Sequence, residues 1–238
     1  SNIANALLIL GIGAVAAKNL KVKTSLIDID LPFFFASMAV FVFFALDKVI
    51  TWQEGIALLG FFVVFIIYNA KSGSSEEDIK KDKDELSQLK EQFKSKTKDN
   101  KKRKIFRYCA IVLVSMGFVA LGAKFLIDSV LNLSALFNIS SSMLTITVVA
   151  LGTSLPEVLT SISAIRLGNH AMAIGNVFGS NTFNLLLVGG LPALFSNLQI
   201  DPTTFMIGIP FLILATFVVI FSTMDNQVRI WEGVAMLF

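Results

Sequence analysis

Charged and metal-binding side chains are scarce in this 238-residue sequence. Only 16% of its residues are charged, against about 25% in average globular proteins, and it contains a single cysteine, Cys109, and a single histidine, His170. One cysteine excludes an intramolecular disulfide, and having only one cysteine and one histidine disfavours a soft-metal site. Tyrosine is also rare, with 2 residues against 22 phenylalanines, a balance that suits a lipid-facing surface better than a packed aqueous core.

Apolar residues fill the space that the missing charges leave. They make up 55% of the sequence, in long charge-free stretches, and the mean hydropathy is +0.74. A membrane-spanning helix needs about 20 mostly apolar residues, so the sequence predicts an all-α polytopic membrane protein. The predicted helices lie at residues 2–17, 31–46, 52–70, 105–128, 140–165, 171–195 and 203–223, with a last one beginning near Trp231.

Residues 71–104 have the opposite character, with twelve basic and eight acidic side chains. We expect a charged loop there, between a first domain at 1–70 (three helices) and a second at 105–238 (four helices and the start of a fifth). Its last four residues are basic and adjoin a predicted helix, so the positive-inside rule places it in the cytoplasm. Lys18 and Arg229 fall on that side too. Because the bases lie in loops, the net charge of +3 does not predict nucleic-acid binding.

The sequence contains an internal repeat. SNIANALL at residues 1–8 matches SNTFNLLL at 180–187, and WQEGIALL at 52–59 matches WEGVAML at 231–237 with one residue inserted. The offset stays at 178 or 179 residues, and each segment lies five predicted helices before its partner. An odd number of crossings reverses direction, so the copies form an inverted repeat, as in many secondary transporters. Extending the repeat predicts about 75 residues before Ser1, so we expect a fragment of a ten-helix protein lacking two first helices and most of the last.

Residues 150–190 contain one carboxylate, Glu157, within the motif GTSLPE. Gly152 and Pro156 predict a helix break there, and a break frees backbone carbonyls near Ala150 that need partners inside the bilayer. Thr153 and Glu157 are four residues apart and share a helical face. Carbonyl, hydroxyl and carboxylate oxygens are ligands that Ca²⁺ and Na⁺ accept.

A second predicted break, GNVFGSN, begins at Gly175 and Asn176. Gly175 and Gly179 follow a spacing that favours close helix approach. Ser180 and Asn184 then present a hydroxyl and an amide on one face, and the repeat carries the same pair as Ser1 and Asn5.

These motifs resemble the sodium/calcium exchangers of the cation/Ca²⁺ antiporter superfamily, especially the YrbG-type prokaryotic members. The resemblance implies ten helices in two inverted five-helix halves, with Ca²⁺ and Na⁺ competing for a midplane site in the plasma membrane. Its implied ligands are Glu157 bridging Ca²⁺ and Na⁺, oxygens of Thr153 and Ser154, the Ala150 carbonyl for Na⁺, and Ser180, Asn184, Ser1 and Asn5.

Sodium coupling is favoured because proton-coupled relatives typically carry an acid in Gly-Asn-x-x-Glu, which Gly175–Phe178 lacks. Proton-coupled or other-cation exchange and a non-transporting membrane scaffold are the alternatives. An intramembrane hydrolase using Ser154 or Glu157 needs a base or a second acid nearby and is disfavoured because no His or Asp lies in the breaks, so no enzyme is expected. A lone Glu157 does not neutralise Ca²⁺, so we expect this chain alone to be inactive. Two copies pairing through the second repeat would bring two Glu157 residues together, which crosslinking at Ser161 would detect.

Overall fold

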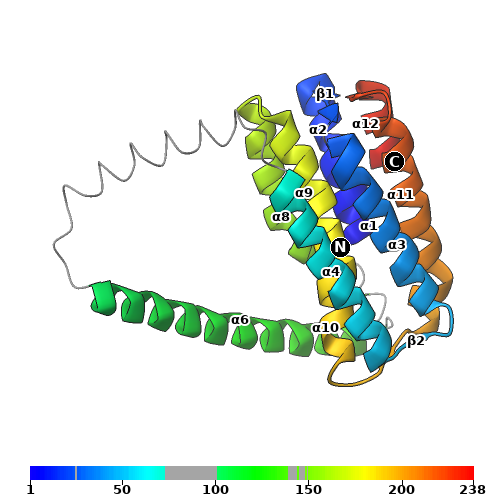
Figure 1. Cartoon of the computed structure of the whole chain (residues 1–238). Helices are drawn as coiled ribbons and strands as arrows, with labels where there is room; N and C mark the ends of the chain where they lie inside the picture. The colour runs from blue at the N-terminus through cyan, green and yellow to red at the C-terminus, as the bar shows by residue number, and fades with distance from the viewer. Residues whose placement is uncertain (25, 73–100, 139–143, 145–147, 149) are drawn as a thin grey trace. The chain divides into compact units, whose positions relative to one another are not determined.

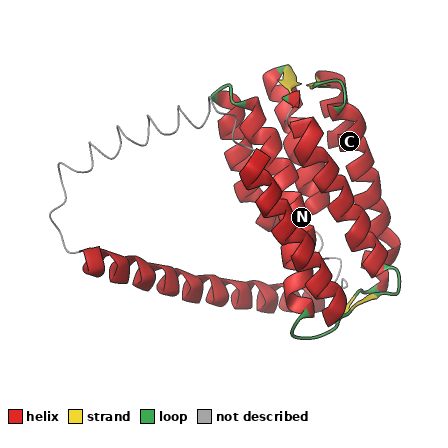
Figure 2. Cartoon of the chain, in the orientation of Figure 1, coloured by secondary structure: helices red, strands yellow, loops and turns green. Residues whose placement is uncertain are grey.

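The protein is described by a computed structural model that covers residues 1–24, 26–72, 101–138, 144, 148 and 150–238. Nearly all of the described chain is helical (Figure 2). It divides into two compact units, residues 1–69 with 142–238 and residues 70–141.

The larger unit contains helices joined by short strands (Figure 1). Segments labelled η are π-helical, and the last residues of α4 belong to the smaller unit. The elements are α1 (Asn2–Ala4), η1 (Asn5–Ile9), α2 (Leu10–Ala17), β1 (Asn19–Lys21), η2 (Leu26–Asp30), α3 (Leu31–Ala45), β2 (Val49–Ile50), α4 (Trp52–Ser72), α8 (Ala150–Arg166), α9 (His170–Phe183), η4 (Asn184–Val188), α10 (Gly189–Ala193), β3 (Leu198–Gln199), η5 (Thr204–Gly208), α11 (Ile209–Thr223), β4 (Gln227–Arg229) and α12 (Ile230–Leu237). The smaller unit contains α6 (Lys101–Phe137).

The membrane class is confirmed by helix length and composition. Among the described residues, four helices are long and apolar enough to cross a membrane: Leu26–Ala45, Trp52–Lys71, His170–Ala193 and Thr204–Thr223. Asn2–Ala17 is apolar but shorter. Pro32 and Pro210 stand at equivalent positions, where the π-helical segments η2 and η5 pass into α3 and α11.

Three predicted boundaries differ from the structure. The helix predicted at 31–46 begins at Leu26, because η2 continues it backward through the charged Asp28 and Asp30. The helix predicted at 105–128 runs from Lys101 to Phe137. Helix therefore enters the predicted loop 71–104 at both ends, and residues 73–100 lie outside the described part, as do most of residues 140–149.

The strand pairs show that the repeat is inverted. β1 pairs antiparallel with β4, and β2 with β3. The offset of 179 takes β1 onto β3 and β2 onto residues 228–229 of β4, and it reproduces the register, so one pair is the image of the other. The helix Leu26–Ala45 separates the two pairs, which places them at opposite ends of the unit (Figure 1). Helices that are equivalent in the repeat, such as α2 and α10, therefore terminate at opposite ends of the larger unit.

Two helix crossings obey the same symmetry. A Cβ added at Gly233 of α12 would lie 2.7 Å from Ala14 Cβ and 2.9 Å from the Gly11 carbonyl oxygen. A Cβ at Gly55 of α4 would lie 2.9 Å from both Ala193 Cβ and the Gly190 carbonyl oxygen. Gly11 and Ala14 correspond to Gly190 and Ala193 at offset 179. Both crossings join one half of the repeat to the other.

Candidate functional site

A cavity of about 610 Å³ opens beside α8 and collects most of the polar residues that the sequence singled out. Its polar lining comes from Ser1, Asn2, Thr153, Glu157, Asn184 and Thr204, with the backbone of Ala150 also in contact. Phe41, Ile209 and Leu212 supply part of an apolar wall. Glu157 is the only ionisable side chain among these described lining residues, and it is half-buried. The site is thus an oxygen-rich patch with one negative charge.

The predicted helix break at Gly152 and Pro156 is wrong. α8 runs from Ala150 to Arg166 with Pro156 inside it. Pro156 has no N–H to donate to the Gly152 carbonyl, yet the helix continues through it. One turn further on, Thr160 Oγ1 lies 3.0 Å from both the Pro156 and the Glu157 carbonyl oxygens. The helix therefore continues through the acid, about two turns after its start.

The Ala150 carbonyl is already a hydrogen-bond acceptor. Ser154 Oγ donates to it at 2.8 Å and Thr153 Oγ1 at 3.2 Å. The Ser154 hydroxyl is fully buried and also lies 3.3 Å from the Ser1 carbonyl oxygen. Ser154 therefore ties α8 to the start of α1, whereas Thr153 lines the cavity.

The second predicted break is also wrong, because α9 is continuous through Gly175, Asn176 and Gly179. Among the described residues, a Cβ at Gly179 would meet nothing within 4 Å, and one at Gly175 only Leu26 at 3.6 Å. The close approaches lie instead at the crossings formed by Gly233 and Gly55.

Asn176 links α9 to α8 beside the acid. Its Nδ2 lies 2.9 Å from Ser161 Oγ, 3.3 Å from the Glu157 carbonyl oxygen and 3.4 Å from Thr160 Oγ1. Ser161 is 1% exposed. This amide therefore holds the turn of α8 that carries Glu157.

The two Ser/Asn pairs meet across the repeat. Asn5 Nδ2 donates to Ser180 Oγ at 3.4 Å, and Asn184 Nδ2 donates to Ser1 Oγ at 3.2 Å. Each bond is the symmetry image of the other, since Ser1 corresponds to Ser180 and Asn5 to Asn184. The paired spacing predicted in the sequence thus produces a real contact between the halves.

Irregular backbone begins at each of these asparagines. Asn5 opens η1 and Asn184 opens η4, and π-helical turns are frequent at functional sites. The Oδ1 atoms of Asn2, Asn5 and Asn181 are buried with no hydrogen-bond partner among the described residues. Buried oxygens without a donor are costly, and a cation is one group that satisfies them.

The structure brings together only part of the predicted ligand set. Five of its eight members line the cavity: Glu157, Thr153, Ala150, Asn184 and Ser1. The other three, Ser154, Ser180 and Asn5, lie behind the lining and bond its members or one another. Sequence reasoning missed Asn2 and Thr204. The signal for Asn2 was available, since Ser-Asn recurs in the repeat as Ser180-Asn181.

Known proteins similar to this chain include an inner membrane protein and a sodium/calcium exchanger. The family model described as "Sodium/calcium exchanger protein" matches residues 1–71 and 107–238. Inner membrane protein YrbG of Escherichia coli is 31% identical over 205 residues, which are 86% of this chain and 61% of YrbG. Sodium/calcium exchanger MaX1 of Methanosarcina acetivorans is 32% identical over 127 residues, 53% of this chain and 36% of that protein. The chain therefore spans less than two thirds of either relative.

The fold also matches solved structures of the sodium–calcium exchanger NCX_Mj. One of them superposes with a TM-score of 0.63 at 22% identity, covering 99% of this chain and 70% of that chain. At this identity the likeness establishes the fold, an inverted-repeat antiporter fold. The match of the family model extends over most of the chain. This chain belongs to the sodium/calcium exchanger protein family.

Proposed function

We propose that the protein is an antiporter that exchanges Ca²⁺ for Na⁺ across the plasma membrane. The observation that carries the proposal is the cavity beside α8, where Glu157 is the one ionisable side chain amid hydroxyl, amide and carbonyl oxygens. Oxygen ligands suit Ca²⁺ and Na⁺. A carboxylate in a membrane helix is costly unless it has a partner, and this makes it a functional candidate.

In this proposal the residues divide into three roles. Glu157 supplies the charge, and Thr153, Asn184, Ser1 and the Ala150 carbonyl supply neutral oxygens. Bound Ca²⁺ and Na⁺ use the same oxygens, so one displaces the other, and exchange follows from exclusive occupancy rather than from covalent chemistry.

The remaining predicted ligands act from behind the lining. Ser154 fixes Ala150, and Asn5 holds Ser180. The unpartnered Asn5 Oδ1 is a further oxygen that a cation could bind. Asn176 positions Glu157 by donating a hydrogen bond to the backbone carbonyl of Glu157.

One carboxylate neutralises half the charge of Ca²⁺. Among the described residues that line the cavity there is no second acid. We therefore propose that this chain alone does not exchange ions. Two copies joined through α8 would supply two Glu157 residues. Ser161 is unsuited to test this because it is buried against Asn176, but Leu159, 64% exposed on the same helix, is available for cysteine crosslinking. Crosslinking that yields only monomer contradicts pairing through α8.

The proposed topology follows the basic residues. Lys18, Lys21, Lys23 and Arg229 lie at or beside the β1/β4 pair, and the backbone N–H of Lys21 bonds His170 Nδ1, which brings the start of α9 to the same end. The positive-inside rule then places that end, and the segment 71–104, in the cytoplasm.

Proton-coupled exchange remains the second candidate within transport, and a non-transporting scaffold the third. The decisive experiment measures Ca²⁺ uptake into proteoliposomes that hold the full-length gene product, with either a Na⁺ or a proton gradient imposed. Uptake is expected with the Na⁺ gradient only. A proton gradient that drives equal uptake without Na⁺ overturns sodium coupling.

The Glu157→Gln variant tests the site itself. Removing one member of a buried charged pair costs about 3–5 kcal/mol, so Na⁺-driven uptake should fall at least about 100-fold. Asp28→Asn is the matched control, because it also removes one carboxylate but at an exposed position outside the cavity. Equal uptake by the Glu157→Gln variant and the parent contradicts the proposed site.

A further inference from the structure

A second cavity, of about 690 Å³, lies at the β1/β4 end of the larger unit. Two cationic side chains, Lys18 and Arg229, line it together with the amides of Asn19 and Gln227 and the apolar surfaces of Trp231 and Val234. Trp231 is 64% exposed and Val234 is 41% exposed. The cavity therefore combines positive charge with an exposed aromatic and aliphatic wall.

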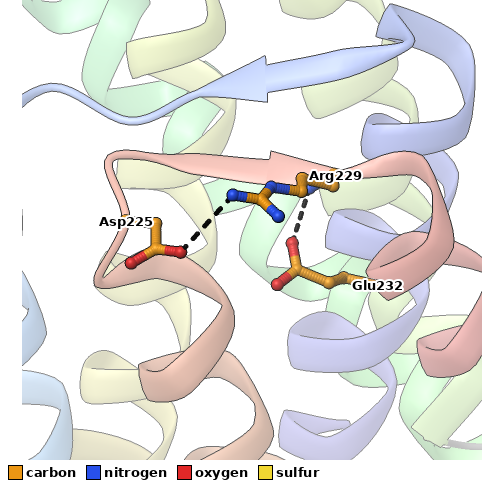
Figure 3. A network of polar contacts seen from close by, with 3 residues as sticks. All are labelled: Asp225, Arg229 and Glu232. Atoms are coloured by element: carbon orange, nitrogen blue, oxygen red, sulfur yellow. Dashed lines mark hydrogen bonds and ion pairs between the residues drawn. The ribbon is translucent and has the colours of Figure 1, made fainter.

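The backbone fixes both cations in place. Lys18 adopts a left-handed conformation (φ 63°) that ends α2, and β1 begins at the next residue. Arg229 is the N-cap of α12, where its backbone N–H donates to Glu232 Oε2 at 2.6 Å (Figure 3). Both residues thus stand where membrane helices end or begin, at the depth where a lipid headgroup lies.

Two carboxylates lie near Arg229, and neither neutralises the cavity. Glu232 is occupied by the backbone N–H of Arg229. Asp225 Oδ2 lies 3.8 Å from Arg229 Nη2, with both side chains about half exposed or more (Figure 3). A single long contact of this kind is a weak ion pair, so a phosphate can compete for the guanidinium, whose planar donors match phosphate oxygens.

The opposite end of the unit has the equivalent strand pair, β2 with β3, without this chemistry. The repeat places Asn197 at the position of Lys18 and Trp52 at that of Trp231, and Thr51 caps α4 through Glu54 as Arg229 caps α12 through Glu232. The nearby cation at that end, Lys48, lies 5.0 Å from the centroid of the Phe205 ring. The two cations are therefore not needed for the fold of the strand pair, since the equivalent pair forms with neutral residues.

We propose that the β1/β4 cavity binds the headgroup of an anionic membrane phospholipid. Lys18 and Arg229 contact the phosphate, Asn19 and Gln227 donate to headgroup oxygens, and Trp231 and Val234 pack against the glycerol and upper acyl chains. Basic residues near the membrane surface attract anionic lipids, and tryptophan favours this interfacial depth. The site is separate from the cavity of Glu157, which shares no lining residue with it.

The two tryptophans of the sequence give a matched pair of reporters. In a Trp52→Phe background only Trp231 fluoresces, and in a Trp231→Phe background only Trp52 does. Each protein is placed in nanodiscs with phosphatidylglycerol or phosphatidylcholine brominated near the carboxyl end of its acyl chains, since bromine quenches a tryptophan that it contacts. We expect brominated phosphatidylglycerol to quench Trp231 preferentially and both lipids to quench Trp52 equally. An equal preference at the two tryptophans overturns the proposal, because it shows general attraction of anionic lipid.

Paired substitutions locate the effect. Lys18→Asn with Arg229→Thr installs the residues of the opposite end, and threonine keeps the N-cap arrangement seen between Thr51 and Glu54. At about fivefold per basic residue, the preference of Trp231 for phosphatidylglycerol should drop about 25-fold. Lys18→Asn alone, which leaves all contacts of Arg229 intact, should lose about fivefold and serves if the double variant does not fold.

Lys23→Asn with Arg166→Thr is the control, since it removes two charges outside the cavity. An equal loss in this control overturns the proposal. So does displacement of the brominated lipid by inorganic phosphate alone, which would identify a site for free phosphate.

Discussion

At one end of the larger unit β1 pairs with β4 beside the Gly11/Gly233 crossing, and at the other β2 pairs with β3 beside the Gly55/Gly190 crossing. Both ends have a two-stranded pair, and the halves have π-helical segments at equivalent positions. The polar side chains differ, because Lys18 at one end corresponds in the repeat to Asn197 at the other. The glycine positions that decide how backbones approach and the Ser/Asn pairs beside the Glu157 cavity are therefore shared between the halves, whereas the cationic Lys18 has a neutral counterpart.

The glycine crossings should give the largest effect on stability. Gly233→Ala and Gly55→Ala each place a Cβ 2.9 Å or less from a backbone carbonyl and an alanine Cβ, and overpacking of this kind costs up to about 3 kcal/mol. Both variants should lower the melting temperature in detergent by similar amounts. Gly60→Ala is the control on α4, since a Cβ there meets nothing within 4 Å. A fall for only one of the two crossings would break the symmetry argument.

Hydrogen bonds from Asn176 join α9 to α8, whereas α12 with α2 and α4 with α10 approach closely at glycines. Asn176→Ala removes the amide bonds to Ser161 Oγ and to the Glu157 carbonyl and leaves a buried hydroxyl short of a partner, at a cost of about 1–2 kcal/mol. The melting temperature and the apparent Ca²⁺ affinity should both fall. If the affinity is unchanged while the melting temperature falls, Asn176 supports the fold and does not position Glu157.

The helix caps provide a smaller test of the same symmetry. Glu54 Oε2 accepts from the Thr51 N–H at 2.8 Å, and Glu232 Oε2 accepts from the Arg229 N–H at 2.6 Å. Glu54→Ala and Glu232→Ala should each cost about 0.5–1 kcal/mol, measured by thermal melting. A markedly larger loss for Glu232 would show that its role near Arg229 exceeds capping.

The smallest effect concerns Asp201, which stands at the start of η5 where the repeat places Lys23. Thr204 Oγ1 donates to Asp201 Oδ2 at 2.5 Å, and the N–H groups of Thr203 and Thr204 donate to Oδ1. The hydrogen bond from the Thr204 side chain, with those backbone bonds, holds the pKa of Asp201 below its ordinary value of 3.8. Its contribution is therefore present above that ordinary pKa and is lost as the pH falls through the lowered one.

Asp201→Asn should consequently flatten the acid limb of a melting-temperature profile slightly. Asp47→Asn, at the same end, is the comparison, because Asp47 accepts only the Val49 N–H at 3.1 Å among the described contacts. An identical change in both profiles would contradict the assignment to Asp201.

The sequence was sufficient to predict the membrane class and the inverted repeat, because hydropathy and the offset of 178–179 are properties of the residue string itself. It also marked Ser1 with Asn5 and Ser180 with Asn184 as equivalent pairs, but the contacts between the two pairs across the halves are visible only in the structure. The domain boundaries and the roles of the ligands remain predictions.

What the sequence could not show depends on neighbours from elsewhere in the chain. Pro156 predicted a break, but α8 continues through it, and hydroxyls such as that of Thr160 bond the adjacent carbonyls. Gly175 and Gly179 had the spacing of a close approach, yet a close approach also needs a small partner, and Gly233 and Gly55 have one. The π-helical segments arise from a shift in hydrogen bonding that no composition marks. Nothing in the sequence predicted that Ser161 would be buried against Asn176.

The central claim is that Glu157 provides the negative charge of a binding site that Na⁺ and Ca²⁺ share. The most direct test is equilibrium binding of Ca²⁺ to the purified full-length protein, with and without Na⁺, for the parent, Glu157→Gln and Asp28→Asn. The account predicts that Na⁺ displaces Ca²⁺ from the parent and from Asp28→Asn, and that Glu157→Gln binds Ca²⁺ at least about 100-fold more weakly. Unchanged Ca²⁺ affinity in Glu157→Gln would contradict it.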